Sequence, residues 1–165
     1  MAKPTKYATL ICAIMTVVAL IGILLGILFS KPIIIVACLL PTVIYEAYRT
    51  EGESTRWASW VLLLVIILEI ILIAANINFD LGKFFGESTK TVAGYTVPLG
   101  DIKIFGPVIM GILSIILFIR TRGKYTKWLA AVIFVTCFAI VYALNPDILK
   151  QLFKIGVEEG LKNLN

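Results

Sequence analysis

The sequence contains no histidine among its 165 residues. Histidine is the commonest ligand of catalytic zinc, copper and haem iron, and the usual general base of serine and cysteine hydrolases. The chain also lacks a glycine-rich phosphate loop, the H-E-x-x-H and G-x-S-x-G motifs, an EF-hand loop and paired carboxylates. We therefore expect no enzyme activity, no metal site and no cofactor.

Charged residues are scarce, at 15%, whereas 60% of the residues are hydrophobic. Ordinary soluble domains contain about 25% charged residues, so the composition predicts a membrane protein. The net charge is +5, but the cations cluster at the ends of apolar runs. No basic stripe with interleaved aromatic residues accompanies them, so we expect the lipid bilayer, and not nucleic acid, as the partner of this charge.

Only three cysteines are present, Cys12, Cys38 and Cys137, and each lies inside an apolar segment. They form no C-x-x-C pair, so the sequence indicates neither a disulfide framework nor a zinc site.

A short basic sequence motif occurs twice. Arg49–Trp57 and Arg120–Trp128 both match R-T-x-G-x-x-T-[RK]-W, at a separation of 71 residues, and each lies between two apolar runs. Short loops rich in Lys and Arg stay on the cytoplasmic side, so we interpret both as cytoplasmic hairpin turns. The repeat is either an ancient hairpin duplication or a convergence of tight basic turns. The residues that anchor this topology are Arg49, Arg56, Trp57, Arg120, Arg122, Lys124, Lys127 and Trp128.

The apolar runs predict an all-α polytopic membrane protein with about five transmembrane helices in a single membrane domain covering residues 1–165. The first run is too long for a signal peptide and has no small-residue cleavage site, so we expect it to be retained. The topology predicts a multi-pass protein of the cell membrane with a cytoplasmic N-terminus and an extracytoplasmic C-terminus. The spans are predicted at residues 7–29, 32–48, 57–75, 105–119 and 128–144.

Two segments outside the spans carry their own patterns. In the outer loop, residues 78–104, β-branched residues at 91–97 and 102–104 flank a Pro/Gly/Asp turn, which predicts a small extracytoplasmic β-hairpin. Residues 146–163 place apolar and polar side chains on opposite faces, which predicts an amphipathic C-terminal helix. Such a helix lies in the membrane interface or packs on a partner, and its composition does not choose between them.

Glu69 is the one charged-type residue deep within a predicted span. Twelve residues separate it from Trp57, which places it about 18 Å from the cytoplasmic interface at 1.5 Å per residue. A carboxylate facing lipid at that depth costs several kcal/mol, so we expect Glu69 to face protein or a water-filled cavity. Tyr142 and Thr16 lie at a suitable depth to hydrogen-bond with it. The group either holds helices together, awaits an arginine on a partner, or handles ions or protons.

Two further features concern packing. Gly22, Gly26 and Ser30 recur at four-residue spacing, which favours close approach of another helix but is also common in membrane helices. Glu46 lies three residues before Arg49, so we expect the two to pair on one helix face and reach interfacial water.

These patterns lead to two hypotheses of function. The first is a small non-catalytic structural or accessory subunit of a larger membrane complex, with other membrane subunits or copies of itself as partners. The alternative is a proton- or cation-coupled carrier or channel built around Glu69.

Overall fold

The computed structural model describes residues 6–77, 90–92, 95–97 and 102–146. They form five long helices and one short strand pair, and each helix is long and apolar enough to cross a membrane. The helices are α1 (Ala8–Leu28), α2 (Pro32–Arg49), α3 (Glu53–Ala74), α5 (Ile102–Arg120) and α6 (Lys124–Leu144). The strands are β1 (Lys90–Val92) and β2 (Tyr95–Val97).

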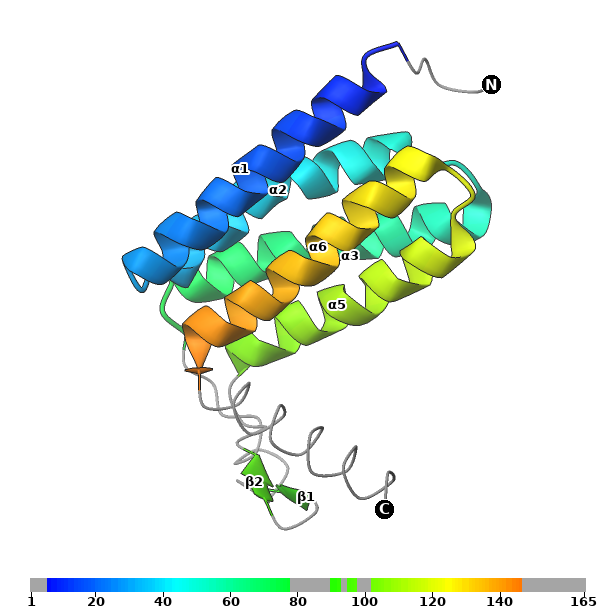
Figure 1. Cartoon of the computed structure of the whole chain (residues 1–165). Coiled ribbons are helices and arrows are strands. Elements are labelled where there is room, and N and C mark those ends of the chain that lie inside the picture. The colour runs from blue at the N-terminus through cyan, green and yellow to red at the C-terminus, as the bar shows by residue number, and fades with distance from the viewer. Residues whose placement is uncertain (1–5, 78–89, 93–94, 98–101, 147–165) are drawn as a thin grey trace, which may run out of the picture.

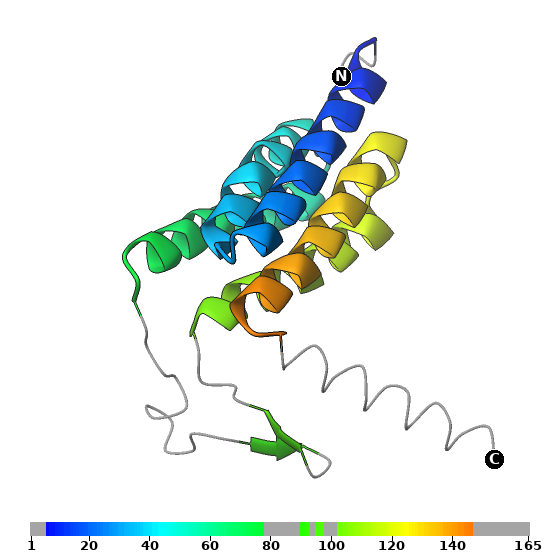
Figure 2. The ribbon, with the colours of Figure 1, turned by 60° about the vertical axis from the view of Figure 1, so that its left-hand side comes forward.

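Four of the helices form a closed ring, in which α2 packs on α3, α3 on α5, α5 on α6, and α6 back on α2. Helix α1 lies outside the ring and packs against both α2 and α6 (Figure 1). Figure 2 shows the same bundle from a second direction, with α1 in front, between α2 and α6. The α2–α3 and α5–α6 turns, residues 50–52 and 121–123, lie at the same end of the bundle (Figure 1). We call this end the turn end and the opposite end the loop end.

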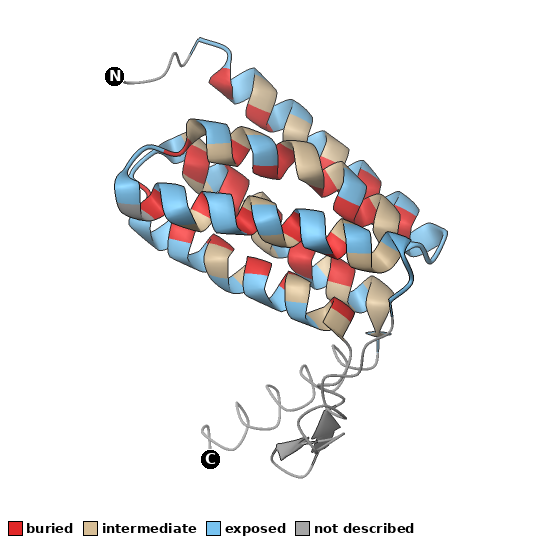
Figure 3. Ribbon diagram, turned by 180° about the vertical axis from the view of Figure 1, so that it is seen from behind, coloured by how far each residue is buried: buried red, intermediate tan, exposed pale blue. Residues whose placement is uncertain are grey.

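The interior of the ring is filled mainly by apolar side chains. Figure 3 shows how buried and exposed residues alternate along each helix. Many of the exposed residues are large and hydrophobic. Such an apolar outer surface is expected if lipid tails surround the helices. The buried hydrophobic cluster consists of Ile35, Val36, Leu39, Val43, Leu62, Ile66, Met110, Leu117, Ala130, Ile133, Cys137 and Ile140.

The two hairpins of the ring have the same helix boundaries once the 71-residue offset is applied. Helices α2 and α5 end at the first residue of each turn motif, Arg49 and Arg120. Helices α3 and α6 begin at the fifth residue of each motif. At their other ends the boundaries agree within one residue. The turn motif therefore marks a repeat of the whole hairpin.

The hydrogen bonds of the two turns are also equivalent. The Thr50 hydroxyl donates to the carbonyl of Glu46, and the Thr121 hydroxyl to that of Leu117, which is four residues back in each case. On the other side of each turn, a threonine hydroxyl donates to the carbonyl of the motif glycine. These bonds satisfy carbonyls at the helix ends, and they explain why both threonines recur in the motif.

The buried positions agree as well. Each buried residue of α3 has a buried residue of α6 at the offset of 71, and several positions of α2 and α5 match in the same way. The α3–α6 pairs are Thr55 with Thr126, Ser59 with Ala130, Leu62 with Ile133, Ile66 with Cys137, and Glu69 with Ile140.

The structure corrects several predicted boundaries. Both turns are only three residues long, because the polar residues 53–56 and 124–127 form the first turns of α3 and α6. The predicted β-hairpin is not supported. Residues 102–104 are the first turn of α5, and both observed strands, 90–92 and 95–97, lie on one side of the predicted turn. Lys103 is buried in this first helical turn, and its ammonium group donates to the Asn76 side chain after α3. The predicted tail helix falls almost entirely outside the described residues, as does most of the outer loop.

Candidate functional site

Two glutamates are buried inside the bundle, one near each end, and they are the candidate functional groups. Glu46 on α2 is fully buried near the turn end. Its Oε1 accepts hydrogen bonds from the hydroxyl of Thr50 at 2.5 Å and from that of Ser59 on α3 at 3.1 Å. Each hydroxyl also has a backbone carbonyl within hydrogen-bonding distance, so neither depends on the carboxyl group alone.

One side of this cluster lacks partners. In the described part of the chain, Oε2 of Glu46 and the hydroxyl of Thr42 are both buried without a hydrogen bond. Thr42 lies one helical turn from Glu46, so both face the same side of α2. Buried polar atoms without partners cost about 1–3 kcal/mol each, so this arrangement is not optimised for stability.

The expected pairing of Glu46 with Arg49 is wrong. The carboxyl group points into the bundle, while the Arg49 guanidinium lies over the ring of Tyr125, with Cζ 4.8 Å from the centroid. Arg49 also donates to the hydroxyl of Tyr45 at 3.5 Å. Residues three apart in a helix share a face only approximately, and the aromatic ring of the second hairpin takes the cation.

Glu69 lies near the loop end, on the face of α3 that meets α5, and only 1% of it is exposed. The expectation that it faces protein is therefore confirmed. Its carboxyl group occupies the space beside Gly106 of α5, where an added Cβ would lie 2.9 Å from its Cδ. Glycine at 106 is what makes room for a carboxyl group between these two helices.

Both glutamates occupy positions where the other repeat has an aliphatic residue. The offset of 71 pairs Glu46 with Leu117 and Glu69 with Ile140, and all four positions are buried. A hydrogen-bond partner of Glu46 differs between the repeats as well, since Ser59 corresponds to Ala130. At these two buried positions the α2–α3 hairpin thus has acidic residues and the α5–α6 hairpin has aliphatic ones.

No family matches this sequence. No curated protein and no solved structure is similar to it either. The chemistry of the site therefore has to be judged from its own geometry.

The two acids are separated by an apolar layer. Ser59, which bonds to Glu46, precedes Glu69 by ten residues of α3, which is about 15 Å of helix. Leu62 and Ile66 lie between them and are fully buried. Among the described residues, no three His, Cys, Asp or Glu side chains form a group that could hold a metal ion. Hydrogen-bonded transfer from one carboxyl group to the other is therefore interrupted by packed side chains.

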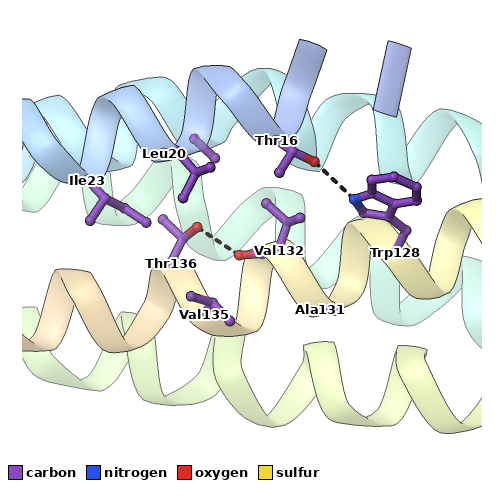
Figure 4. Close-up of a pocket in the computed structure, with 9 residues that line it drawn as sticks. Thr16, Leu20, Ile23, Trp128, Ala131, Val132, Val135 and Thr136 are labelled. Carbon is purple, nitrogen blue, oxygen red and sulfur yellow. Dashed lines mark hydrogen bonds between the residues drawn. The ribbon is translucent and has the colours of Figure 1, made fainter. Parts of the chain in front are cut away.

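The structure does not bring Thr16 or Tyr142 to Glu69. The Thr16 hydroxyl donates to the carbonyl of Cys12 at 2.7 Å and accepts from the indole N–H of Trp128 at 3.0 Å (Figure 4). Thr16 of α1 and Trp128 of α6 both line a groove of about 360 Å³ between these two helices. Tyr142 is 42% exposed on the outside of α6. Depth along a span was too weak a criterion, because it says nothing about the side of the helix.

The small-residue stripe lies where α1 meets α2. A Cβ added to Gly22 would overlap Cys38, and one added to Gly26 would overlap Ile35. Ser30 is not part of this contact, because it lies in the turn between the helices and adopts a left-handed backbone with φ of 52°. Gly22 and Gly26 thus determine how closely α1 approaches the ring.

The topology anchors gather at the turn end, on the two turns and the first or last helical turns beside them (Figure 1). Trp57 is 75% exposed, and Lys127 lies 5.7 Å from the centroid of the Phe118 ring. Arg56, Arg122 and Lys124 are also exposed, while Arg120 ends α5.

Two residues of the candidate site were missed by sequence reasoning. These are Gly106 and Ser59, and none of the sequence patterns described above marks either of them. Aligning the two repeats over their full length, and not only at the turns, would have paired Ser59 with the apolar Ala130 and Gly106 with the larger Ile35.

Proposed function

We propose that the protein is a non-catalytic structural or accessory subunit of a larger membrane assembly. The observation that carries this proposal is the combination of a filled interior and an apolar exterior. The core of the ring is packed with buried aliphatic residues, and the described grooves lie on the outside and are lined mainly by apolar side chains. Such surfaces suit contact with lipid and with other helices.

In this proposal the turn end faces the cytoplasm. Both short turns and the start of α1 are there, and cations with aromatic residues recur at these helix ends. This distribution supports a cell-membrane protein with its N-terminus inside and its C-terminus outside.

The proposal is tested by extracting the full chain from native membranes in two mild detergents and measuring the mass of the particles by native mass spectrometry. We expect the chain in a fixed ratio with at least one other polypeptide in both detergents. Particles that contain only this chain would refute the proposal.

A second candidate function is proton or cation transport that depends on Glu69. The observation that favours it is the burial of two carboxyl groups toward opposite ends of the bundle, at positions that are aliphatic in the other repeat. Glu69→Gln keeps the shape and removes the titratable proton. Loss of pH-dependent flux in proteoliposomes, with an unchanged melting temperature, would support transport, whereas equal flux in the two proteins would leave Glu69 as a packing residue.

A further inference from the structure

We propose that the outer seam between α3 and α5 binds a transmembrane helix of another protein, in the way that the seam between α2 and α6 binds α1. This inference rests on the proposed function, and it specifies the surface and the kind of partner. We call these two surfaces the α3–α5 seam and the α2–α6 seam.

The two seams are equivalent in the internal repeat. Exchanging the hairpins converts α2 into α5 and α6 into α3, and it leaves the ring of helix contacts unchanged. Helix α1 contacts α2 and α6 and so covers one of two related surfaces. Within the described part of the chain, no sixth helix covers the other.

Residues that α1 shields on the first seam have exposed counterparts on the second. Cys38 of α2 lies against Gly22 and is half-buried, whereas its counterpart Ile109 is exposed. On the other helix of each seam, Trp128 is 43% exposed and its counterpart Trp57 is 75% exposed. Among the residues that the structure describes, the second seam is therefore the equivalent surface without a covering helix.

The concave features correspond too. A groove of about 400 Å³ on α3 is lined by residues that include Trp57, Trp60, Val61 and Leu64. Their counterparts at the offset of 71 are Trp128, Ala131, Val132 and Val135, and these line the groove between α1 and α6 (Figure 4). The α3 groove thus includes the positions that face α1 in the other repeat, and it extends from there along α3 to Leu63 and Ile67.

The two tryptophans also indicate a polar contact. The indole N–H of Trp128 donates to the hydroxyl of Thr16 on α1. Trp57 presents the same group at the equivalent position, and within the described residues no hydrogen bond from it is seen. A helix seated there gains a hydrogen bond by offering a hydroxyl or carbonyl oxygen near the turn end.

The occupant is a helix with small residues at four-residue spacing, because Gly22 and Gly26 are what let α1 approach its seam. A second copy of this chain does not supply α1 for the purpose. In every copy that small-residue face is already buried against α2, and residues 29–31 hold the two helices together. We therefore assign the seam to a helix from a different chain.

The test uses a synthetic peptide with the sequence of residues 6–31 as the probe, carrying a photoreactive amino acid in place of Leu20, which lines the α1–α6 groove. The probe is reconstituted with the full chain in vesicles of phosphatidylcholine and phosphatidylglycerol, irradiated, and its attachment sites are mapped by mass spectrometry. We expect saturable attachment to residues 57–68 of α3.

A double variant of the seam and a matched control make the test specific. Trp57→Ala with Leu64→Ala should lower the yield at least about threefold, the change that corresponds to one average interhelical hydrogen bond. Phe138→Ala with Ile115→Ala removes a similar aromatic and aliphatic pair from the exposed groove between α5 and α6 and should leave the yield unchanged. Trp57→Phe keeps an aromatic ring and removes the indole N–H, so its crosslinking yield should be intermediate. This variant replaces the double variant if the double variant fails to fold.

Three results would overturn the inference. Attachment to α6 would show that the probe replaces α1, and attachment spread over all exposed faces would show a surface covered by lipid. Crosslinking between full chains with the photoreactive residue at Leu64 would assign the seam to a second copy. The proposed function is tested separately. A native complex whose contacts lie elsewhere refutes the seam and leaves the subunit function standing, whereas a chain isolated without partners refutes both.

Discussion

Replacing Glu46 by leucine should leave the protein as stable as before or make it more stable. This change copies the other repeat, where Leu117 occupies the equivalent buried position. A charged or polar group in a bundle core is ordinarily expected to be costly to remove. Here the surroundings predict the opposite, because the hydroxyls of Thr50 and Ser59 keep their backbone acceptors.

The magnitude follows from two opposing terms. The substitution removes two side-chain hydrogen bonds, and these are worth about 0.6 kcal/mol each inside membrane proteins. It also removes a buried oxygen without a partner in the described residues, which relieves about 1–3 kcal/mol. The net effect lies between neutrality and a stabilisation of about 2 kcal/mol, as seen when buried polar groups are replaced by apolar residues of similar volume.

The free energy of unfolding is measured by SDS titration of the protein in mixed micelles, followed by circular dichroism. Leu117→Ala provides the matched control, because deleting a buried leucine side chain should cost about 2–5 kcal/mol. A loss of more than about 2 kcal/mol for Glu46→Leu would refute the reasoning, because it would mean that the carboxyl group makes more bonds than those described.

Three further predictions concern packing and orientation. Gly106→Ala should destabilise the bundle by about 1–3 kcal/mol by crowding the carboxyl group, and Glu69→Ala in the same chain should recover most of that loss in the SDS titration. Gly26→Val should weaken the docking of α1 by a similar 1–3 kcal/mol, seen as an earlier loss of the Trp128 fluorescence signal in a variant that keeps only this tryptophan; an unchanged midpoint would count against the close contact. Single cysteines at Gly123 and Gly94, in a background without native cysteines, should be labelled from opposite sides of the membrane, and labelling of both from one side would contradict the topology.

The number of helices and the equivalence of the turns could be predicted from sequence, because long apolar runs and clustered cations leave few alternatives. The repeat was harder to recognise from sequence. Outside the turns, equivalent positions of the two hairpins are buried alike but are occupied by different residues. Ile66 and Cys137 share no chemistry beyond being apolar, yet they occupy equivalent core positions. Core membership depends on position along the helix and on apolarity, so alignment by residue identity alone loses the signal.

The environment of the two glutamates could be predicted only in part. That Glu69 faces protein follows from the cost of exposing a carboxyl group to lipid, but its place beside Gly106 depends on the register between α3 and α5. Register is fixed by packing across a connection of 27 residues between the two helices, and no local pattern reports it. Glu46 was misassigned because a nearby arginine suggested a local pair, while a tyrosine 76 residues after that arginine attracts the cation instead.

The contact between α1 and α6 joins the first and last of the described helices. Its two side-chain hydrogen bonds link residues separated by 116 and 112 positions. During synthesis α1 is therefore made long before half of its docking surface exists, and until α6 enters the membrane it has only α2 beside it. Insertion of α6 thus completes the docking surface of α1. In a chain truncated after α5, the Thr16 hydroxyl would lose its contact with the Trp128 indole and would face lipid, which distinguishes unfinished molecules from finished ones.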